Sequence, residues 1–454
     1  MQALAARSDL GSLVLTAIAA LAAMHTIFDW AAIIASGAPI GYGEGAVAHA
    51  GQLLARGRDP YGLEPAGTFV SANYPPLAYA VEAIGATLGP FTALRVVNVT
   101  ACVAIATVAT LHARGSRFAA IAIGGSFLAL YPVAVWGGSA RVDPLAVALT
   151  AFSVVAASAD PRRATIAGVL GALALAAKPT AALPLLTVLA YLAWRERPIA
   201  IRFGAALAAS SLLVLAVMLL RFDGAGLWLH LVVHNALAFD VRNLLFLALL
   251  ATVLMGAYVG GAMYVADGRM RAYVLGAAAV ILLGGHEGAT VNYLFDLAAA
   301  SCVALAPMAT RLPGRIPAVF AAQLVATLFL VTFGPLAPLD LAAYSARVET
   351  ARTLGAGPVY AEDSGVLIAS GIEPVIDDPY LWARLVALGV RSDDVTPRIR
   401  AAEFAAVVSF VPLDQLEGAP LFEQQLWPPP LVAAVLDRYR LDRRAGTLWI
   451  YVPR

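Results

Sequence analysis

Residues 199–220, IAIRFGAALAASSLLVLAVMLL, indicate which class of protein this is. The stretch contains a single charged side chain, Arg202, and charged residues stand close on both sides of it. A helix of this length is about 33 Å long, because each residue adds about 1.5 Å. The hydrocarbon core of a bilayer is roughly 30 Å thick, so we predict a transmembrane helix.

The composition extends this prediction to most of the chain. Of the 454 residues, 61% are hydrophobic and 13% are charged, whereas soluble domains carry about 25% charged residues. The formal net charge is +1, so the chain lacks the basic excess of a nucleic-acid-binding protein. We predict an all-α polytopic membrane bundle with about eleven transmembrane helices, at 11–35, 92–113, 117–137, 142–159, 163–179, 180–195, 199–220, 243–266, 271–285, 290–309 and 315–335.

The basic residues predict the orientation of this bundle. In this segmentation, the short loops with arginines all fall on one side, which the positive-inside rule makes cytoplasmic. The N-terminal span is too long for the core of a signal peptide and is expected to be retained. An odd number of spans then places the C-terminus outside the cytoplasm. The arginines concerned are Arg114, Arg117, Arg162, Arg163, Arg195, Arg197, Arg269, Arg271, Arg311 and Arg315.

The first outer loop, 36–91, has structure of its own. Residues 44–56 form an amphipathic pattern, and residues 75–88 form a second apolar stretch that is short for a span. Both patterns are typical of helices that lie in the membrane interface. The alternative is that 75–90 crosses the membrane, which would place Arg114 and Arg117 outside.

The composition changes at about residue 336, where charged residues return. We therefore divide the chain into a membrane domain, 1–335, and an extracytoplasmic α/β domain, 336–454. Short strands are expected at 359–360, 366–369, 405–410 and 449–452, and helices at 379–388 and 430–438.

Two acidic residues of the outer side are candidates for a general base. Glu44 stands between Gly43 and Gly45 just beyond the first span, where it is either a solvated loop acid or a base for an acceptor hydroxyl. Asp143 lies two residues after Arg141 at the mouth of a span. Such charges are costly near lipid unless they pair with each other or serve a function.

Cations on the same side are candidates for binding a phosphate. Lys178 is the only lysine of the chain and lies within apolar sequence. An ammonium there either extends to the interface or binds an anion such as a lipid phosphate. Arg141 and Arg58 are further candidates, although Arg58 can equally anchor the interface.

Metal binding is not predicted. His230 and His234 have a helical i, i+4 spacing, but no HExxH pattern surrounds them. A divalent cation is left open as a cofactor, and no other cofactor is expected.

Several stretches, taken in order, resemble the GT-C glycosyltransferases, and among them the bacterial family 39 and family 87 mannosyltransferase-like proteins. The resemblance covers nearly the whole chain. It rests on Tyr42-Gly43-Glu44-Gly45, Gly57-Arg58-Asp59-Pro60-Tyr61, Asn73-Tyr74-Pro75-Pro76-Leu77, Arg141-Val142-Asp143-Pro144, Lys178-Pro179-Thr180, Val291-Asn292-Tyr293-Leu294, Ala361-Glu362-Asp363, Asp377-Asp378-Pro379 and Trp449-Ile450-Tyr451-Val452-Pro453.

The resemblance implies a multi-pass enzyme of the bacterial inner membrane with an extracytoplasmic active site. It would move a sugar from a polyprenyl-phosphate donor to a glycan, lipid or protein acceptor, with inversion. Glu44 would be the base, with Asp143 as the alternative, and Lys178, Arg141 and Arg58 would bind the donor phosphate. The expected substrate-binding residues are Tyr42, Asn73, Tyr74, His286, Asn292 and Tyr293.

Two other classes of function remain open from the sequence. A transporter or flippase for a lipid-linked sugar would use a similar bundle, but such proteins often show internal repeats, and none is visible here. A non-catalytic envelope assembly protein with an outer α/β domain would give Glu44 no role beyond folding.

Overall fold

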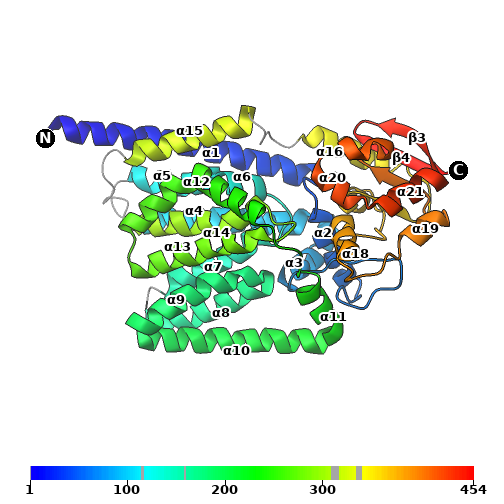
Figure 1. The fold of residues 1–454 in the computed structure, drawn as a ribbon. Helices are drawn as coiled ribbons and strands as arrows, with labels where there is room; N and C mark the ends of the chain where they lie inside the picture. The colour runs from blue at the N-terminus through cyan, green and yellow to red at the C-terminus, as the bar shows by residue number, and fades with distance from the viewer. Residues whose placement is uncertain (1, 114–116, 158–159, 308–315, 334–339) are drawn as a thin grey trace.

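The structure is a computed structural model, and it describes residues 2–113, 117–157, 160–307, 316–333 and 340–454. A long helical bundle forms one part, and a smaller α/β part covers one end of it (Figure 1). The N-terminus lies at the opposite end of the bundle from the α/β part. The helices of the bundle are α1 (Gln2–Ser36), α4 (Thr92–His112), α5 (Arg117–Ala129), α6 (Tyr131–Trp136), α7 (Asp143–Ala157), α8 (Pro161–Ala177), α9 (Ala182–Arg195), α10 (Arg197–Arg221), α12 (Val241–Val265), α13 (Gly268–Val280), α14 (Phe295–Leu305) and α15 (Ile316–Phe333).

Each of the eleven predicted spans contains a helix, but several of these helices are short or interrupted. The segment 117–137 is divided into α5 and α6 at Leu130, whose backbone is extended ahead of Pro132. Among the described residues, four helices are long and apolar enough to cross a membrane. The candidate spans within them are Leu13–Ser36 of α1, Thr92–His112, Arg197–Arg221 and Val241–Val265.

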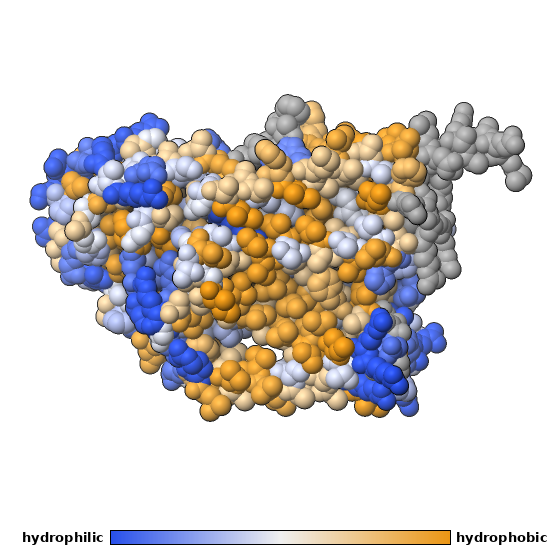
Figure 2. Space-filling model, turned by 180° about the vertical axis from the view of Figure 1, so that it is seen from behind, coloured by the Kyte–Doolittle hydropathy of each residue, from blue (hydrophilic) through white to orange (hydrophobic). Residues whose placement is uncertain are grey.

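The flank of the bundle presents apolar side chains to its surroundings. On α10, Leu213 is 66% exposed and Leu220 is 88% exposed. Figure 2 shows that hydrophobic residues cover the middle of the molecule, while hydrophilic residues gather at the two ends. Exposing such a large apolar surface to water is unfavourable, so this hydrophobic middle region fits contact with lipid.

The arginine-bearing connections that the structure describes lie at the same end of the bundle, as the orientation prediction requires. The α9–α10 connection, with Arg195 and Arg197, and the start of α13 lie at the end of the bundle away from the α/β part (Figure 1). Arg114, Arg311 and Arg315 lie outside the described residues.

The first outer loop contains α2 (Glu44–Ala55), α3 (Leu77–Ile84) and the short 3₁₀ helix η1 (Ala86–Leu88). The eight residues of α3 are too few to cross a bilayer, which removes the alternative of a span at 75–90. Most residues of α2 are buried. This helix lies against α3 and the α/β part (Figure 1), so protein covers most of it. That it lies at the level of the membrane interface stays a prediction.

The α/β part holds a four-stranded sheet in the order β1-β2-β4-β3. Strand β1 (Val359–Ala361) pairs in parallel with β2 (Ala406–Ser409), and β4 (Leu448–Pro453) is antiparallel to both β2 and β3 (Tyr439–Ala445). The helices of this part are α16 (Leu341–Ala351), α17 (Ser364–Ala369), α18 (Pro379–Ala387), α19 (Thr396–Arg400), α20 (Leu421–Leu426) and α21 (Pro429–Arg438).

Two elements of this part differ from the sequence prediction. The apolar residues 366–369 belong to helix α17, because the Asp363 side chain accepts a hydrogen bond from the Gly365 N–H and caps the helix. Strand β3 was missed because its sequence, YRLDRRA, is polar. It is an edge strand whose side chains are mostly exposed, so it lacks the apolar alternation that marks half-buried strands.

Gly45 allows the two parts to approach closely. A Cβ atom at this position would overlap the Gly365 backbone and the Ser364 hydroxyl. We expect Gly45→Val to lower the free energy of unfolding by about 1–3 kcal/mol, the usual range for overpacking, measured by denaturation of the detergent-solubilised protein. Gly41→Ala is the matched control, because a Cβ there meets nothing within 4 Å. Equal stability of the two variants would contradict this close packing.

Candidate functional site

A cavity of about 330 Å³ lies where the bundle meets the α/β part. The bundle, the first outer loop and the N-terminus of α18 all contribute to its wall, so the cavity exists only when these parts are assembled. Its polar and aromatic lining residues are Asn73, Tyr74, Lys178, Thr180, His234, Asn235, His286, Glu287, Tyr293, Asp378 and Tyr380.

Lys178 is the buried cation of this cavity, with 3% of its surface exposed. Helix α8 ends at Ala177, and Pro179 starts the next short turn, so Lys178 occupies an extended break between two helices. Its Nζ lies 2.6 Å from Asp143 Oδ1 and 4.6 Å from the centre of the Tyr293 ring. The positive charge is therefore fixed in place and still faces the cavity.

Asp143 and Asn292 lie behind Lys178. The Asn292 amide donates to Asp143 Oδ1 over 2.9 Å, and its own oxygen accepts a hydrogen bond from the Thr290 hydroxyl. Asp143 Oδ2 is buried without a hydrogen-bond partner among the described residues. Neither side chain lines the cavity, so their direct effect is on the position and charge of Lys178.

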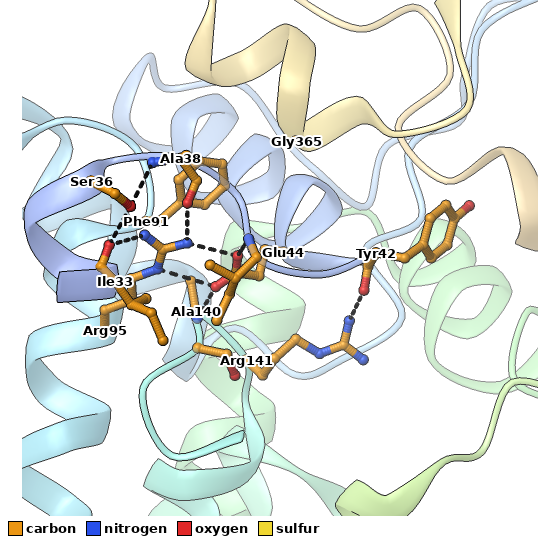
Figure 3. A network of polar contacts seen from close by, with 12 residues as sticks. Ile33, Ser36, Ala38, Tyr42, Glu44, Phe91, Arg95, Ala140, Arg141 and Gly365 are labelled. Carbon is orange, nitrogen blue, oxygen red and sulfur yellow. Dashed lines mark hydrogen bonds and ion pairs between the residues drawn. The ribbon is translucent and has the colours of Figure 1, made fainter. Parts of the chain in front are cut away.

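Arg141 points toward the first outer loop. Its guanidinium lies 5.2 Å from the centre of the Trp136 ring. Its Nη1 donates to the Tyr42 carbonyl over 2.9 Å (Figure 3). Gly43 makes this contact possible, because a Cβ there would overlap the guanidinium and the backbone has φ +90°. Asn98 of α4 holds the loop that carries Arg141, between α6 and α7, by donating to the carbonyls of Ser139 and Arg141.

Glu44 is enclosed in a separate polar network. Its Oε2 lies 2.8 Å from Arg95 Nη2 and accepts a hydrogen bond from the Ile40 N–H, while Oε1 accepts from Arg95 Nε and the Ala140 N–H. Arg95 also donates to the carbonyls of Ile33 and Ala38 (Figure 3). The network ties the end of α1, the start of α2, helix α4 and the loop before α7 together.

This placement argues against Glu44 as the base. A general base must come within hydrogen-bond reach of the proton that it removes. Glu44 is fully buried, does not line the cavity, and already accepts four hydrogen bonds on its two oxygens. The sequence could not reveal this, because the partner Arg95 lies inside a predicted span.

The other predicted residues divide into two groups. Asn73, Tyr74, His286 and Tyr293 line the cavity with Lys178. Tyr42 lies next to it: its hydroxyl donates to Asp378 Oδ1 over 2.6 Å and accepts a hydrogen bond from the Tyr380 N–H.

Arg58 does not join this group. Its Nη1 lies 2.6 Å from Glu373 Oε1, the side chain is more than half exposed, and it lines a different cleft. The prediction that Arg58 binds the same phosphate as Lys178 is therefore not supported by its position.

Residues of the α/β part were not assigned to the site from the sequence. Asp378, Tyr380 and Leu381 line the cavity beside the bundle residues. Glu287 of the bundle also lines it and forms a two-bond ion pair with Arg384 of α18. The available signal was the Asp377-Asp378-Pro379 run, a typical helix start.

The histidines predicted at helical spacing pack against aromatic rings. The rings of His230 and His234 lie 4.8 Å apart, and they contact Tyr61 and Phe69 respectively. Among the residues that the structure describes, no group of three or more metal-ligating side chains is close enough to hold a metal ion.

Comparison with known proteins relates the fold to solved structures. No protein-family model and no curated protein matches the chain. ArnT from Cupriavidus metallidurans bound to undecaprenyl phosphate is similar with a TM-score of 0.62 and 12% identity, over 95% of this chain and 97% of that one. The apo state of ArnT gives a TM-score of 0.59 and 13% identity over 95% and 98%. The chain therefore shares the overall fold of ArnT, which agrees with the predominantly helical bundle predicted from the sequence.

Proposed function

We propose that this chain is a GT-C membrane glycosyltransferase that takes a sugar from a polyprenyl-phosphate donor. The observation that carries the proposal is a single buried ammonium, Lys178, facing a cavity walled by Tyr74, Tyr293 and Tyr380. A buried cation with an open side is a ready site for a phosphate, and aromatic rings suit the faces of a sugar. The relation to ArnT, which binds undecaprenyl phosphate, supports a lipid-linked donor.

The reaction would be a single displacement. An acceptor hydroxyl attacks the anomeric carbon, the bond from that carbon to the phosphate oxygen breaks, and polyprenyl phosphate leaves with the electron pair. The configuration is inverted. Lys178 stabilises the charge that grows on the leaving phosphate, because a preorganised cation favours such a transition state. Arg141 does not line the cavity and would add only the effect of its positive charge, which acts on Tyr74 and Asp143. The mannosyltransferase-like families 39 and 87 are the proposed relatives within the GT-C group.

The reaction also needs a general base other than Glu44, which does not reach the cavity. Asp143, the alternative to Glu44, has one free oxygen but is engaged with Lys178. A cavity-lining carboxylate would meet the requirement of direct contact with the acceptor.

The site is proposed to face the extracytoplasmic side of the inner membrane, where nucleotide sugars are absent. A reporter enzyme that is active only after translocation, fused after Arg454, is expected to be active in intact cells. The same reporter fused after Arg197, in a basic connection, is the control and should be silent. A silent fusion at Arg454 would contradict the odd number of spans.

Cleavage of the donor tests the function itself. Membranes from cells expressing the chain are incubated with a panel of synthetic polyprenyl-phosphate hexoses and pentoses, labelled in the sugar. We expect label to move from the lipid to an acceptor in the membranes, with release of polyprenyl phosphate. Donor lipid that crosses the bilayer intact, with no release, would instead identify a flippase.

A further inference from the structure

We propose that Asp378, a residue of the α/β part, is the general base of the transfer reaction. The inference rests on the glycosyltransferase function proposed above and assigns the residue that this function requires. Asp378 lines the same cavity as Lys178 and Tyr293 and comes from the N-terminus of α18. The α/β part would thus complete the catalytic site of the bundle.

The Asp378 carboxylate is held on one oxygen and open on the other. Oδ1 accepts hydrogen bonds from the Tyr42 hydroxyl at 2.6 Å and the Leu381 N–H at 2.9 Å. Within the described residues, no hydrogen bond to Oδ2 is present. One oxygen fixed and one oxygen free on a cavity wall is the geometry that proton removal from a bound hydroxyl requires.

Backbone pairing holds Asp378 in this position. The Phe69 N–H donates to the Val375 carbonyl, and the Asp377 N–H donates to the Phe69 carbonyl, so the preceding segment pairs with the first outer loop. The neighbouring Asp377 is bound by the Ser71 N–H and by His49. Asp377 is therefore occupied, and the next residue is the one directed at the cavity.

Asp378 also differs from the other acids near the cavity in its charge environment. Asp143 is paired with Lys178, and Glu287 is paired with Arg384. Among the described residues, no cation lies within 4.0 Å of the Asp378 carboxylate. A direct cation would lower the basicity of a carboxylate, so the unpaired acid is the better proton acceptor.

Burial raises the pKa of Asp378 to about 6, while its hydrogen bonds from Leu381 and Tyr42 act in the opposite direction. A base with such a pKa is still ionised near neutral pH and holds a proton more firmly than an ordinary aspartate. The titratable and charged groups that surround it are Tyr42, Asp377 and Arg141 on adjoining segments, and Tyr74, Lys178, His234, His286, Glu287, Tyr293, Tyr380 and Arg384 around the cavity.

In the proposed step, the acceptor O–H proton moves to Asp378 Oδ2. The acceptor oxygen forms a bond to the anomeric carbon as the bond to the phosphate oxygen breaks. The proton is later lost to water. No oxidant, reductant or further co-reactant is needed.

A purely structural role for Asp378 makes a different prediction. Its side chain caps α18, and asparagine caps helices about as well as aspartate. Asparagine also keeps an oxygen that can accept from Tyr42 and Leu381. Capping alone therefore predicts that Asp378→Asn has little effect on transfer.

The test compares transfer and its pH dependence in Asp378→Asn and in wild type, using the membrane assay with labelled polyprenyl-phosphate sugars. Asp363→Asn is the matched control, because Asp363 caps α17, is buried in the same part of the chain, and also has a pKa raised to about 6 by burial. Binding of undecaprenyl phosphate and thermal stability are measured for all three proteins.

We expect Asp378→Asn to lose at least about 100-fold in transfer rate, within the usual range for removal of a general base, with lipid binding and stability retained. In wild type and Asp363→Asn, the rate should rise with pH and level off above a midpoint near 6. In Asp378→Asn, this rise should be absent.

Transfer by Asp378→Asn at a wild-type rate, or with the same pH midpoint, would overturn the assignment while leaving the proposed function intact. Absence of donor cleavage by the wild-type protein with every sugar in the panel would overturn the proposed function itself, and the base assignment with it.

Discussion

Lys178→Met is expected to weaken binding of undecaprenyl phosphate by about 10- to 100-fold. A hydrogen bond to a charged partner contributes roughly 1.5–3 kcal/mol, and Lys178 is the one cation that lines the cavity among the described residues. Methionine keeps most of the length of the apolar stem and removes the ammonium group, with its charge and its hydrogen-bond donors. The measurement is lipid affinity of the purified protein in nanodiscs, without acceptor.

Two further variants separate binding from folding. Lys178→Met leaves the Asp143 carboxylate buried without its cation, which is costly to stability. The double variant Lys178→Met, Asp143→Asn removes both charges and should recover stability while lipid binding remains weak. Lys178→Arg should recover only part of the affinity, because a planar guanidinium does not replace a compact ammonium between Asp143 and Tyr293. Unchanged affinity in Lys178→Met would remove this residue from the donor site.

The fold could be predicted from local sequence because lipid imposes a local rule. A span must be a long apolar helix, and residues such as 199–220 reveal this without any knowledge of their neighbours. The exceptions have local causes as well: Pro132 interrupts the segment 117–137, and the polar edge strand β3 lacks apolar alternation. The position of α2 could not be predicted, because burial by α17 depends on residues more than 300 positions away.

The sequence could predict only those cavity-lining residues that are unusual within their own stretch of sequence. Lys178 and Tyr293 are conspicuous in their own stretches and lie together in the structure. Asp378 could not be assigned in this way, because its position depends on backbone pairing with Phe69 and on the hydroxyl of Tyr42. Local sequence does not show which distant segments will meet.

Glu44 illustrates the same difficulty in the opposite direction. An acid between two glycines at the end of a span has the pattern of a reactive group, yet its carboxylate is enclosed by Arg95 and by the N–H groups of Ile40 and Ala140. Arg95 alone, on α4, has the pattern of a snorkelling residue. Only the pair, formed across 51 positions of sequence, gives both residues their structural role.

Arg95→Met is expected to lower the free energy of unfolding by about 3–5 kcal/mol. Removing one partner of a buried ion pair leaves the other charge uncompensated, and this typically costs that much. Both side chains are about 1% exposed, so solvent does not screen the remaining charge of Glu44. The measurement is chemical or thermal denaturation of the detergent-solubilised protein. Glu82→Gln is a suitable control, because Glu82 is a buried acid that accepts hydrogen bonds from Phe91 and Leu94 without a direct ion pair.

The double variant Glu44→Gln, Arg95→Met then decides between a structural and a catalytic Glu44. It removes both charges, so it should be more stable than Arg95→Met alone, and glutamine retains an acceptor for the N–H of Ile40 or Ala140. If Glu44 only ties the helices together, the double variant should transfer sugar at a rate within a few-fold of the wild-type rate. If Glu44 is the base, transfer should fall by about 10²–10⁴-fold however stable the protein is. We expect the first result, since no oxygen of Glu44 lines the cavity that holds Lys178 and Asp378.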